Sequence, residues 1–209
     1  MIPAIVLAAG KSSRMGRPKA LLPIGASGET FLTRILHVLR DGGLQRAFVV
    51  IGAEADAVRA TLPRDDDFLR IVENRDYELG QLSSLLAGLT AVEDEDDGVL
   101  AALVTLVDLP LISASTVRAV LEAHDKSPGA PIVRPRRGNR HGHPAIFHRR
   151  LFGELRSADP STGAKPVVRA HAAEEVNVDV ADDGAFTDID TPEDYERFIA
   201  PTLRRATEN

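Results

Sequence analysis

The stretch that decides the fold is IPAIVLAAGKSSRMGRPK, residues 2–19. Its first half, Ile2 to Ala9, is an apolar run of the kind that forms a buried strand. Gly10 and Gly16 then allow the backbone to approach a ligand closely, so that main-chain N–H groups point at it. The same loop carries four cations, which are Lys11, Arg14, Arg17 and Lys19. We therefore predict a strand that ends in a phosphate-binding loop.

Two common phosphate-loop motifs do not fit this stretch. A Walker A loop that ended in Gly10-Lys11-Ser12 would require glycine where Ile5 stands. A dinucleotide fingerprint is excluded because no G-x-G occurs there. The alternative is a solvated surface loop, since basic residues between glycines are common at strand ends. Small residues before the turn, and Pro18 stiffening the chain before Lys19, favour phosphate binding.

The stretch LAAGKSSRMGRPKALLPIG, residues 7–25, resembles the signature loop of the nucleotidyltransferases related to the molybdenum cofactor guanylyl- and cytidylyltransferases. Its Ala-Ala-Gly form is similar to the cytidylyltransferase branch, whereas guanylyltransferases tend to carry Ala-Gly-Gly. The resemblance implies a Rossmann-like nucleotidyltransferase fold of the GT-A type. It also implies Mg²⁺-dependent transfer of a nucleoside monophosphate, CMP in this branch, from CTP to molybdopterin, and a molybdoenzyme that receives the product.

Length and composition restrict the class of protein. The 209 residues, 44% of them apolar, suit one domain, which we place at residues 1–200 with a polar tail at 201–209. The absence of cysteine excludes disulfides and thiolate chemistry and fits a cytoplasmic protein. A net charge of -6 and 4% aromatic residues argue against a nucleic-acid partner. No apolar run is long enough for a membrane span.

Apolar runs rich in branched residues alternate with helical patterns, which predicts an α/β fold with a mostly parallel sheet in a single-domain three-layer sandwich. The expected strands are 3–9, 47–51, 69–72, 99–107 and 131–133. The first expected helix begins after a Thr30 cap and ends at Gly42-Gly43. Further helices are expected at 53–61, 83–92, 113–124 and 192–199.

One acid follows a buried-type strand. Leu103 to Val107 ends at Asp108, and ligands of open α/β sheets lie at the carboxyl ends of strands. We expect Asp108 and the loop after Ala9 to face the same crevice, where a carboxylate and substrate phosphates would bind Mg²⁺. The alternative role, a cap for the helix from about Ser113, is awkward because Pro110 and other residues intervene.

A second acidic cluster surrounds residue 190. Thr191 before Pro192 predicts an N-cap, with Glu193 and Asp194 suited to the helix dipole. Asp188 and Asp190 lie two apart on an extended segment and would point the same way. The family resemblance implies that one of them joins the metal, and we choose Asp190 over Asp188. A third acidic run, 93–98, is interpreted as a solvated linker, because adjacent side chains diverge and cannot share an ion.

Residues 74–84 resemble the family's glycine-serine loop at the base and sugar of the nucleotide, although Gln81 and Leu82 stand where cytidylyltransferase relatives often have Met and Ser. The alternative is a helix start capped by Ser83. Together with the first loop, this segment gives the predicted nucleotide-binding residues: Leu7, Ala8, Ala9, Gly10, Lys11, Ser12, Ser13, Arg14, Lys19, Gly80, Ser83 and Ser84.

The segment 135–144 is basic and glycine-rich, and it resembles the R-G-H-P loop on the acceptor side of the cytidylyltransferase branch, with His141 in place of a second Arg. A zinc site at His141 and His143 lacks a third ligand at a familiar spacing. The predicted acceptor-binding residues are Arg136, Arg137, Arg140 and His143.

The resulting hypothesis is nucleotidyl transfer, with Lys19, Arg14 and Asp108 as the catalytic residues and Asp108 and Asp190 as metal ligands. An acceptor phosphate is already ionised at neutral pH, so no general base is required. Two rival functions remain. One is a sugar-phosphate or alditol-phosphate nucleotidyltransferase on the same fold, and the other is a chaperone that binds nucleotide or cofactor without chemistry. A pure binding protein has no need of paired metal acids.

Overall fold

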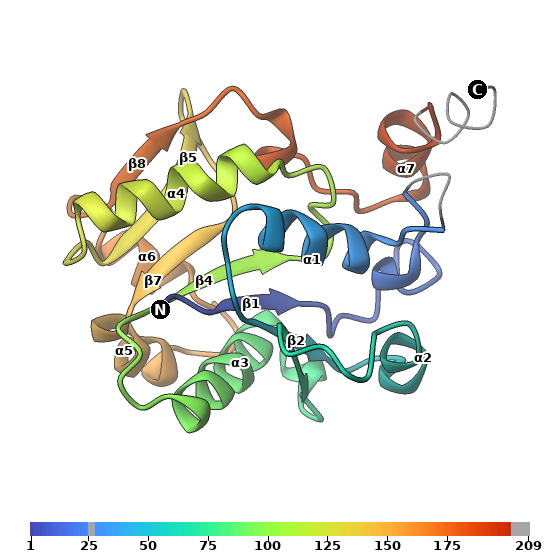
Figure 1. The fold of residues 1–209 in the computed structure, drawn as a ribbon, viewed down its shortest axis with the longest axis horizontal. Coiled ribbons are helices and arrows are strands. Elements are labelled where there is room, and N and C mark those ends of the chain that lie inside the picture. Colours follow the sequence, from blue (N-terminus) through green and yellow to red (C-terminus); the bar gives the residue numbers. More distant parts are fainter. Residues whose placement is uncertain (25–27, 202–209) are drawn as a thin grey trace.

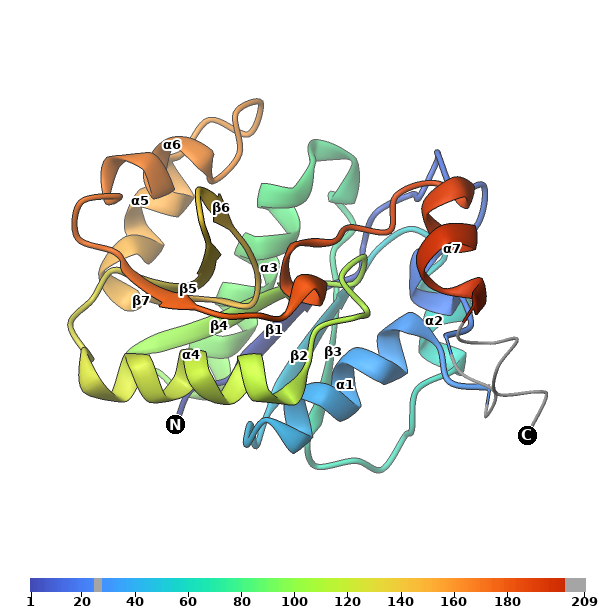
Figure 2. The same cartoon turned by 90° about the horizontal axis from the view of Figure 1, so that it is seen from above.

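The computed structural model describes residues 1–24 and 28–201 (Figures 1 and 2). Gly25 of the signature stretch and residues 202–209 of the predicted tail lie outside the described residues. The chain forms an eight-stranded sheet with the order β3-β2-β1-β4-β7-β5-β6, and β8 pairs with β5. Helices cover both faces of this sheet, so the predicted three-layer α/β sandwich is confirmed. Among the described residues, no helix has both the length and the apolar character needed to cross a membrane.

The first four strands are parallel and form the centre of the fold. They are β1 (Ala4–Leu7), β2 (Ala47–Ile51), β3 (Leu69–Glu73) and β4 (Ala101–Leu106). Every residue of β1 and β2 is buried, because helices cover both faces there. The predicted apolar runs are therefore confirmed as strands.

The remaining strands form a mixed half-sheet. They are β5 (Ile132–Arg137), β6 (Arg140–His141), β7 (Ala145–His148) and β8 (Val176–Asp179). β7 lies between β4 and β5 and is antiparallel to both, whereas β8 is parallel to β5. The sequence reading found only β5 here, because β7 is four residues long and β8 lacks a run of buried side chains.

Two apolar clusters fill the space between the layers. α1 (Phe31–Asp41) and α4 (Ala114–Lys126) pack on one face of the sheet, through Ile35 and Val117 among others. α3 (Gln81–Glu95), α5 (Phe152–Ser157) and α6 (Lys165–Ala170) pack on the other. The peripheral elements are α2 (Ala55–Ala60), α7 (Pro192–Phe198) and the short 3-10 helices η1 (Lys19–Leu21), η2 (Tyr77–Leu79), η3 (Arg149–Leu151) and η4 (Asp183–Phe186).

Two predicted helix starts are confirmed in detail. Thr30 accepts a hydrogen bond from the backbone N–H of Thr33, whose hydroxyl accepts one from the Thr30 N–H in return. Thr191 forms the same reciprocal arrangement with Asp194, and Pro192 opens α7. Both capping boxes satisfy N–H groups that a helix start leaves without partners.

Two other predictions were wrong. Ser83 does not cap α3, because the helix begins at Gln81 and the Ser83 hydroxyl donates to backbone carbonyls. The acidic run is only in part a linker: α3 continues through Glu95, and Glu93 and Glu95 form ion pairs with arginines of neighbouring elements. These ion pairs offset part of the unfavourable interaction between acids and the C-terminal end of a helix dipole.

Candidate active site

The first pocket lies where β1 and β4 end side by side. Leu7 and Leu106 are register partners, and the N–H of Val107 donates to the carbonyl of Leu7 at 3.1 Å. The pocket has a volume of about 310 Å³. It is lined by Leu7, Ala9, Gly10, Ser12, Ser13, Arg14, Lys19, Tyr77, Gly80, Gln81, Ser84, Leu106, Val107, Asp108 and Asp190. The glycine-rich loop and both predicted metal acids thus face one cavity.

The loop after β1 is held in shape by its own residues. Ser12 has a positive φ of 51°, an uncommon conformation for a residue other than glycine. Its hydroxyl accepts a hydrogen bond from the Lys19 backbone N–H at 3.1 Å, and its carbonyl accepts from Met15 and Gly16. Met15 is buried in the core. These contacts fix the turn and carry Lys19 back toward the pocket.

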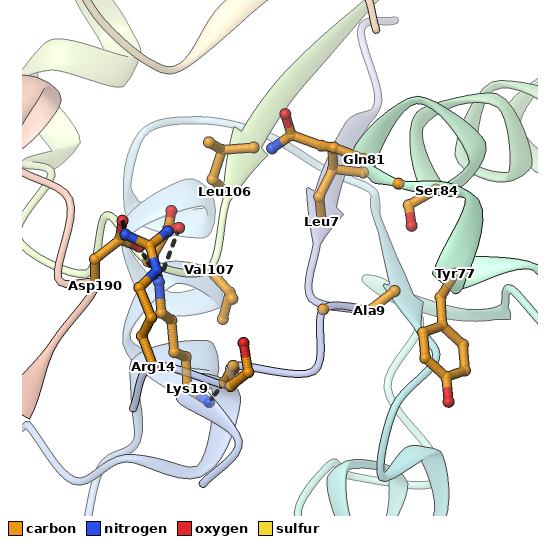
Figure 3. Close-up of a pocket in the computed structure, with 15 residues that line it drawn as sticks. Leu7, Ala9, Arg14, Lys19, Tyr77, Gln81, Ser84, Leu106, Val107 and Asp190 are labelled. Atoms are coloured by element: carbon orange, nitrogen blue, oxygen red, sulfur yellow. Dashed lines mark hydrogen bonds and ion pairs between the residues drawn. The ribbon is translucent and has the colours of Figure 1, made fainter. Parts of the chain in front are cut away.

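One side of the pocket, here called the charged wall, consists of Arg14, Lys19, Asp108 and Asp190, and Lys19 lies at its centre. Its Nζ forms an ion pair with Asp108 at 3.2 Å and a second one with Asp190. Arg14 reaches the other oxygen of Asp190 at 3.0 Å. Figure 3 shows Arg14, Lys19 and Asp190 together on one side of the pocket. The Lys19 side chain is only 11% exposed, so its charge is poorly screened by water.

The two acids arrive from segments far apart in sequence. The N–H of Ile189 donates to the carbonyl of Asp108 at 2.8 Å, which ties the segment before α7 to the end of β4. One oxygen of Asp108, Oδ1, is buried without a hydrogen-bond partner in the described part of the chain. Carboxylate oxygens suit a hard divalent cation, and an oxygen without a donor is free to take one. Asp108 and Asp190 therefore fit a metal ion.

Asp188 is placed differently from Asp190. It is absent from the residues that line the pocket, and neither lysine nor arginine forms an ion pair with it in the described chain. Its pKa is raised by partial desolvation and by the nearby carboxylates of Asp108 and Asp190. Asp188 thus lies close enough to Asp108 and Asp190 to interact with their charges, but it does not line the pocket.

The opposite wall is polar but neutral. Asn74, at the end of β3, donates hydrogen bonds of 3.0 Å to the hydroxyls of both Ser83 and Ser84. Those bonds fix the start of α3, which places Gln81 and Ser84 at the pocket, with Tyr77 beside them (Figure 3). Uncharged groups of this kind suit the base and ribose of a nucleotide, whereas the charged wall suits its phosphates.

Most of the predicted nucleotide residues line this pocket, and three do not. Ala8 is buried in the sheet, Lys11 pairs with Glu78 at 2.5 Å, and Ser83 is turned toward the backbone. The sequence reading missed Tyr77, Gln81, Leu106 and Val107. Signals for them existed: the first two lie in the predicted 74–84 segment, and the last two directly precede Asp108.

A second and larger cavity, of about 770 Å³, adjoins the first. Both cavities are lined by Leu7, Gly80, Gln81 and Leu106, so they meet there. Of the predicted acceptor residues, His143 lines the second cavity, and its Nδ1 lies 3.2 Å from the carbonyl of Val104. Burial lowers the pKa of His143, which keeps its ring neutral at neutral pH.

The predicted acceptor arginines are engaged elsewhere and line neither cavity. Arg136 forms two hydrogen bonds of 3.0 Å with Asp179, and Arg137 pairs with Asp183. Arg140 donates to the carbonyl of Phe186. Within the second cavity, Glu175 is paired with Arg134 at 2.7 Å and with His141 at 3.2 Å. β5 and the residues after it therefore bring Arg134 and His141 to the cavity and direct Arg136, Arg137 and Arg140 to residues 179–186.

A mostly parallel sheet with a cation-rich loop at the end of β1 and acids beyond β4 is the arrangement expected of an α/β nucleotidyltransferase. The comparison with protein families agrees: the MobA-like NTP transferase domain matches residues 4–176, so the chain belongs to that family.

Similar proteins cover most of the chain. "Nicotine blue oxidoreductase" of Paenarthrobacter nicotinovorans is 33% identical over 95% of this chain and 96% of its own length. "Probable molybdenum cofactor guanylyltransferase" of Rhodopirellula baltica is 30% identical over 79% of this chain and 83% of its own. The crystal structure of Rv0371c from Mycobacterium tuberculosis in complex with manganese has a TM-score of 0.71 at 30% identity, covering 95% of this chain and 98% of that one.

Proposed function

We propose that this protein transfers CMP from CTP to the terminal phosphate of molybdopterin, releasing pyrophosphate in a Mg²⁺-dependent reaction. The observation that carries the proposal is the charged wall, where Lys19 and Arg14 contact two aspartates beside a glycine-rich loop. A pocket with cations, carboxylates and free backbone on one side and neutral polar groups on the other suits a nucleoside triphosphate with its metal.

The reaction joins an oxygen of the acceptor phosphate to the α-phosphorus of the nucleotide. The bond from that phosphorus to the oxygen bridging to the β-phosphate breaks, and pyrophosphate leaves with the electron pair. Lys19 and Arg14 neutralise charge that grows on the transferring and leaving oxygens, while the loop after Ala9 aligns the phosphates. Because the acceptor phosphate is ionised, no side chain has to remove a proton from it.

The metal would be held by Asp108 and Asp190. The fit rests on the unpartnered Oδ1 of Asp108 and on the all-oxygen donor set. When bound, Mg²⁺ would supply Lewis-acid stabilisation of phosphate oxygens. The crystal structure of a relative with manganese supports divalent-metal use in this fold. Lys19 now contacts both acids, so it has to turn toward the phosphates when the site is loaded.

The acceptor belongs in the second cavity, which opens into the first beside Gly80 and Gln81. His143 lines it, and the prediction that Arg136, Arg137 and Arg140 bind the acceptor requires their present pairs to open. The preference for CTP rests on the Ala8-Ala9-Gly10 form of the loop. The protein would act in the cytoplasm and pass the product to a molybdoenzyme.

Three rival functions have distinct signatures. A sugar-phosphate nucleotidyltransferase would use the same first pocket with a different second one. The similarity to a protein named as an oxidoreductase raises redox chemistry as another activity, and a cofactor chaperone would bind without turnover. The charged wall favours transfer over both, because neither redox chemistry nor binding alone needs a lysine held between two acids.

The test is pyrophosphate release by the full chain with Mg²⁺, each of the four nucleoside triphosphates, and either molybdopterin or a panel of sugar phosphates. We expect turnover with CTP and molybdopterin, and we expect Lys19→Met to lose it. Lys126→Met should retain it, because Lys126 is an exposed residue at the end of α4 that lines neither cavity. A thermal-shift screen of the four nucleotides reports base preference independently. If the protein binds nucleotide but releases no pyrophosphate with any of these acceptors, the proposal is rejected.

A further inference from the structure

The second cavity has an apolar wall that the chemistry in the first pocket does not explain. Leu82 and Leu85 of α3, Val104 of β4, Phe147 of β7 and Val168 of α6 all line it. Figure 2 shows α6 lying above the strands β5 and β6, on the same side of the sheet as α3. A surface of this kind favours a ligand with an apolar ring body, because burial of apolar area drives its binding.

Two cationic side chains of α6 line the same cavity as that apolar wall. Lys165 and Arg169 both line the cavity, and they are four residues apart on α6, so they share one face of the helix. Both are exposed, and no carboxylate of the described residues forms an ion pair with either side chain. Their positive charge is therefore available to a ligand.

The other charged groups of the cavity compensate one another. The carboxylate of Glu175 is 3% exposed and lies against Arg134 and His141. His143 is neutral, because burial lowers its pKa. The net positive charge facing the cavity thus comes from Lys165 and Arg169, in contrast to the loop arginines with their partners at 179–186.

We propose that Lys165 and Arg169 bind an anionic group of the acceptor, whose ring body packs on the apolar wall formed by Leu82, Leu85, Val104, Phe147 and Val168. This inference rests on the proposed function for the identity of the occupant as an acceptor. The phosphate that reacts has to reach the first pocket, which neither cation lines. The group held by α6 is therefore a second anion, and the substrate class is a ring compound that carries a negative group in addition to its reacting phosphate.

The experiment compares two fluorescent probes that differ by one charge, pterin-6-carboxylate and unsubstituted pterin, in titrations of the full chain. We expect the wild-type protein to bind the carboxylate about tenfold more tightly, the scale of a partly screened pair of charge contacts. The double variant Lys165→Gln/Arg169→Gln should bind both probes with equal affinity. Its affinity for pterin itself should change by less than about twofold.

The matched control is Arg118→Gln/Lys126→Gln, which removes the same charge from exposed positions of α4 that line neither cavity, and it should keep the tenfold preference. Equal binding of the two probes by the wild type, binding of neither, or loss of the preference in this control alone would each overturn the proposal. Thermal shifts with CTP and pyrophosphate release are recorded in parallel. Turnover without a preference for the charged probe would reject this inference and leave the proposed transferase activity intact. The expected preference without turnover would reject the transferase activity and leave the anion site intact.

Discussion

Two basic, glycine-containing segments of this chain look alike in sequence and differ in structure. Residues 10–19 follow β1, and residues 136–141 run from the last two residues of β5 through a turn into β6. In the first, Lys19 and Arg14 meet acids that line the first pocket with them. In the second, Arg136 and Arg137 meet exposed acids and line neither of the two cavities described above. The local count of cations is therefore a poor guide to binding, and the partners of each cation decide what it does.

The largest effect expected from this contrast is on catalysis. Lys19→Met should lower turnover by about 100- to 1,000-fold, about 3 to 4 kcal/mol, because it removes a group that stabilises charge in the transition state. Asp108→Asn should do the same through loss of the metal ligand. Both variants should fold normally by circular dichroism. Pyrophosphate release at a near-normal rate in either one would contradict these roles.

The second expected effect is on stability, in the segment whose acids neutralise the loop arginines. Asp182 accepts hydrogen bonds from the N–H of Ser113, at 2.9 Å, and from the hydroxyl of Thr116, at 2.7 Å, at the start of α4. Asp182→Ala should cost about 2 kcal/mol in the free energy of unfolding, since it leaves these donors unpaired. Asp183→Ala, which removes only an exposed ion pair, should cost less than about 0.5 kcal/mol. Chemical denaturation measures both.

The pH dependence of this difference follows from the Asp182 pKa. Burial alone would raise that pKa, but hydrogen bonds from Thr116, Ser113 and Gly184 outweigh it, so the pKa is lowered. A carboxyl whose folded pKa is depressed stabilises the fold above its unfolded pKa of about 3.9, and the stabilisation is lost as pH falls through the folded value. The gap between wild type and Asp182→Ala should therefore be full at pH 6 and shrink below about pH 4. A gap that grows on acidification would contradict this account.

A third prediction concerns the metal. Lys19 now neutralises Asp108 and Asp190, so it competes with a divalent cation for the same two carboxylates. Without nucleotide, Lys19→Met should bind Mn²⁺ about tenfold more tightly than the wild type, as measured by the free Mn²⁺ signal in electron paramagnetic resonance. Lys126→Met should leave the affinity unchanged. Weaker Mn²⁺ binding in Lys19→Met would mean that the lysine supports the metal site instead of closing it.

The parallel half of the fold and one acid of the pocket, Asp108, were readable from sequence for a physical reason, whereas Asp190 came from the family resemblance. Strands buried on both faces need continuous branched apolar runs, as in residues 47–51, and the residue after such a run lies at the ligand-binding edge, as Asp108 does. β7 was missed because four residues are too short a run to detect, although the strand lies inside the sheet between β4 and β5. β8 was missed because its side chains are only partly buried. α6 was missed as well, and with it Lys165 and Arg169, because six residues give too little periodicity to detect.

The acidic partners of Arg136 and Arg137 could not be predicted from the sequence around these arginines. Arg136 and Asp179 are register partners across β5 and β8, so they meet only once the sheet is assembled. Sequence distance hides such a pair, and each member alone looks like an unpaired surface charge. The same holds for the ion pair of Arg134 with Glu175, which joins β5 to the residue directly before β8.

The smallest expected effect is the one that most directly tests the contrast between the two basic segments. Arg136→Gln/Arg137→Gln removes two exposed ion pairs and no pocket contact, so KM for the acceptor and kcat should each change by less than about threefold. The same measurement on Lys19→Met provides the large-effect reference. A rise of tenfold or more in acceptor KM for the loop variant, with KM for CTP unchanged, would mean that the arginines leave Asp179 and Asp183 to bind the acceptor. The two basic segments would then act alike, as their sequences suggest, and the pairs seen here would belong to the unloaded protein alone.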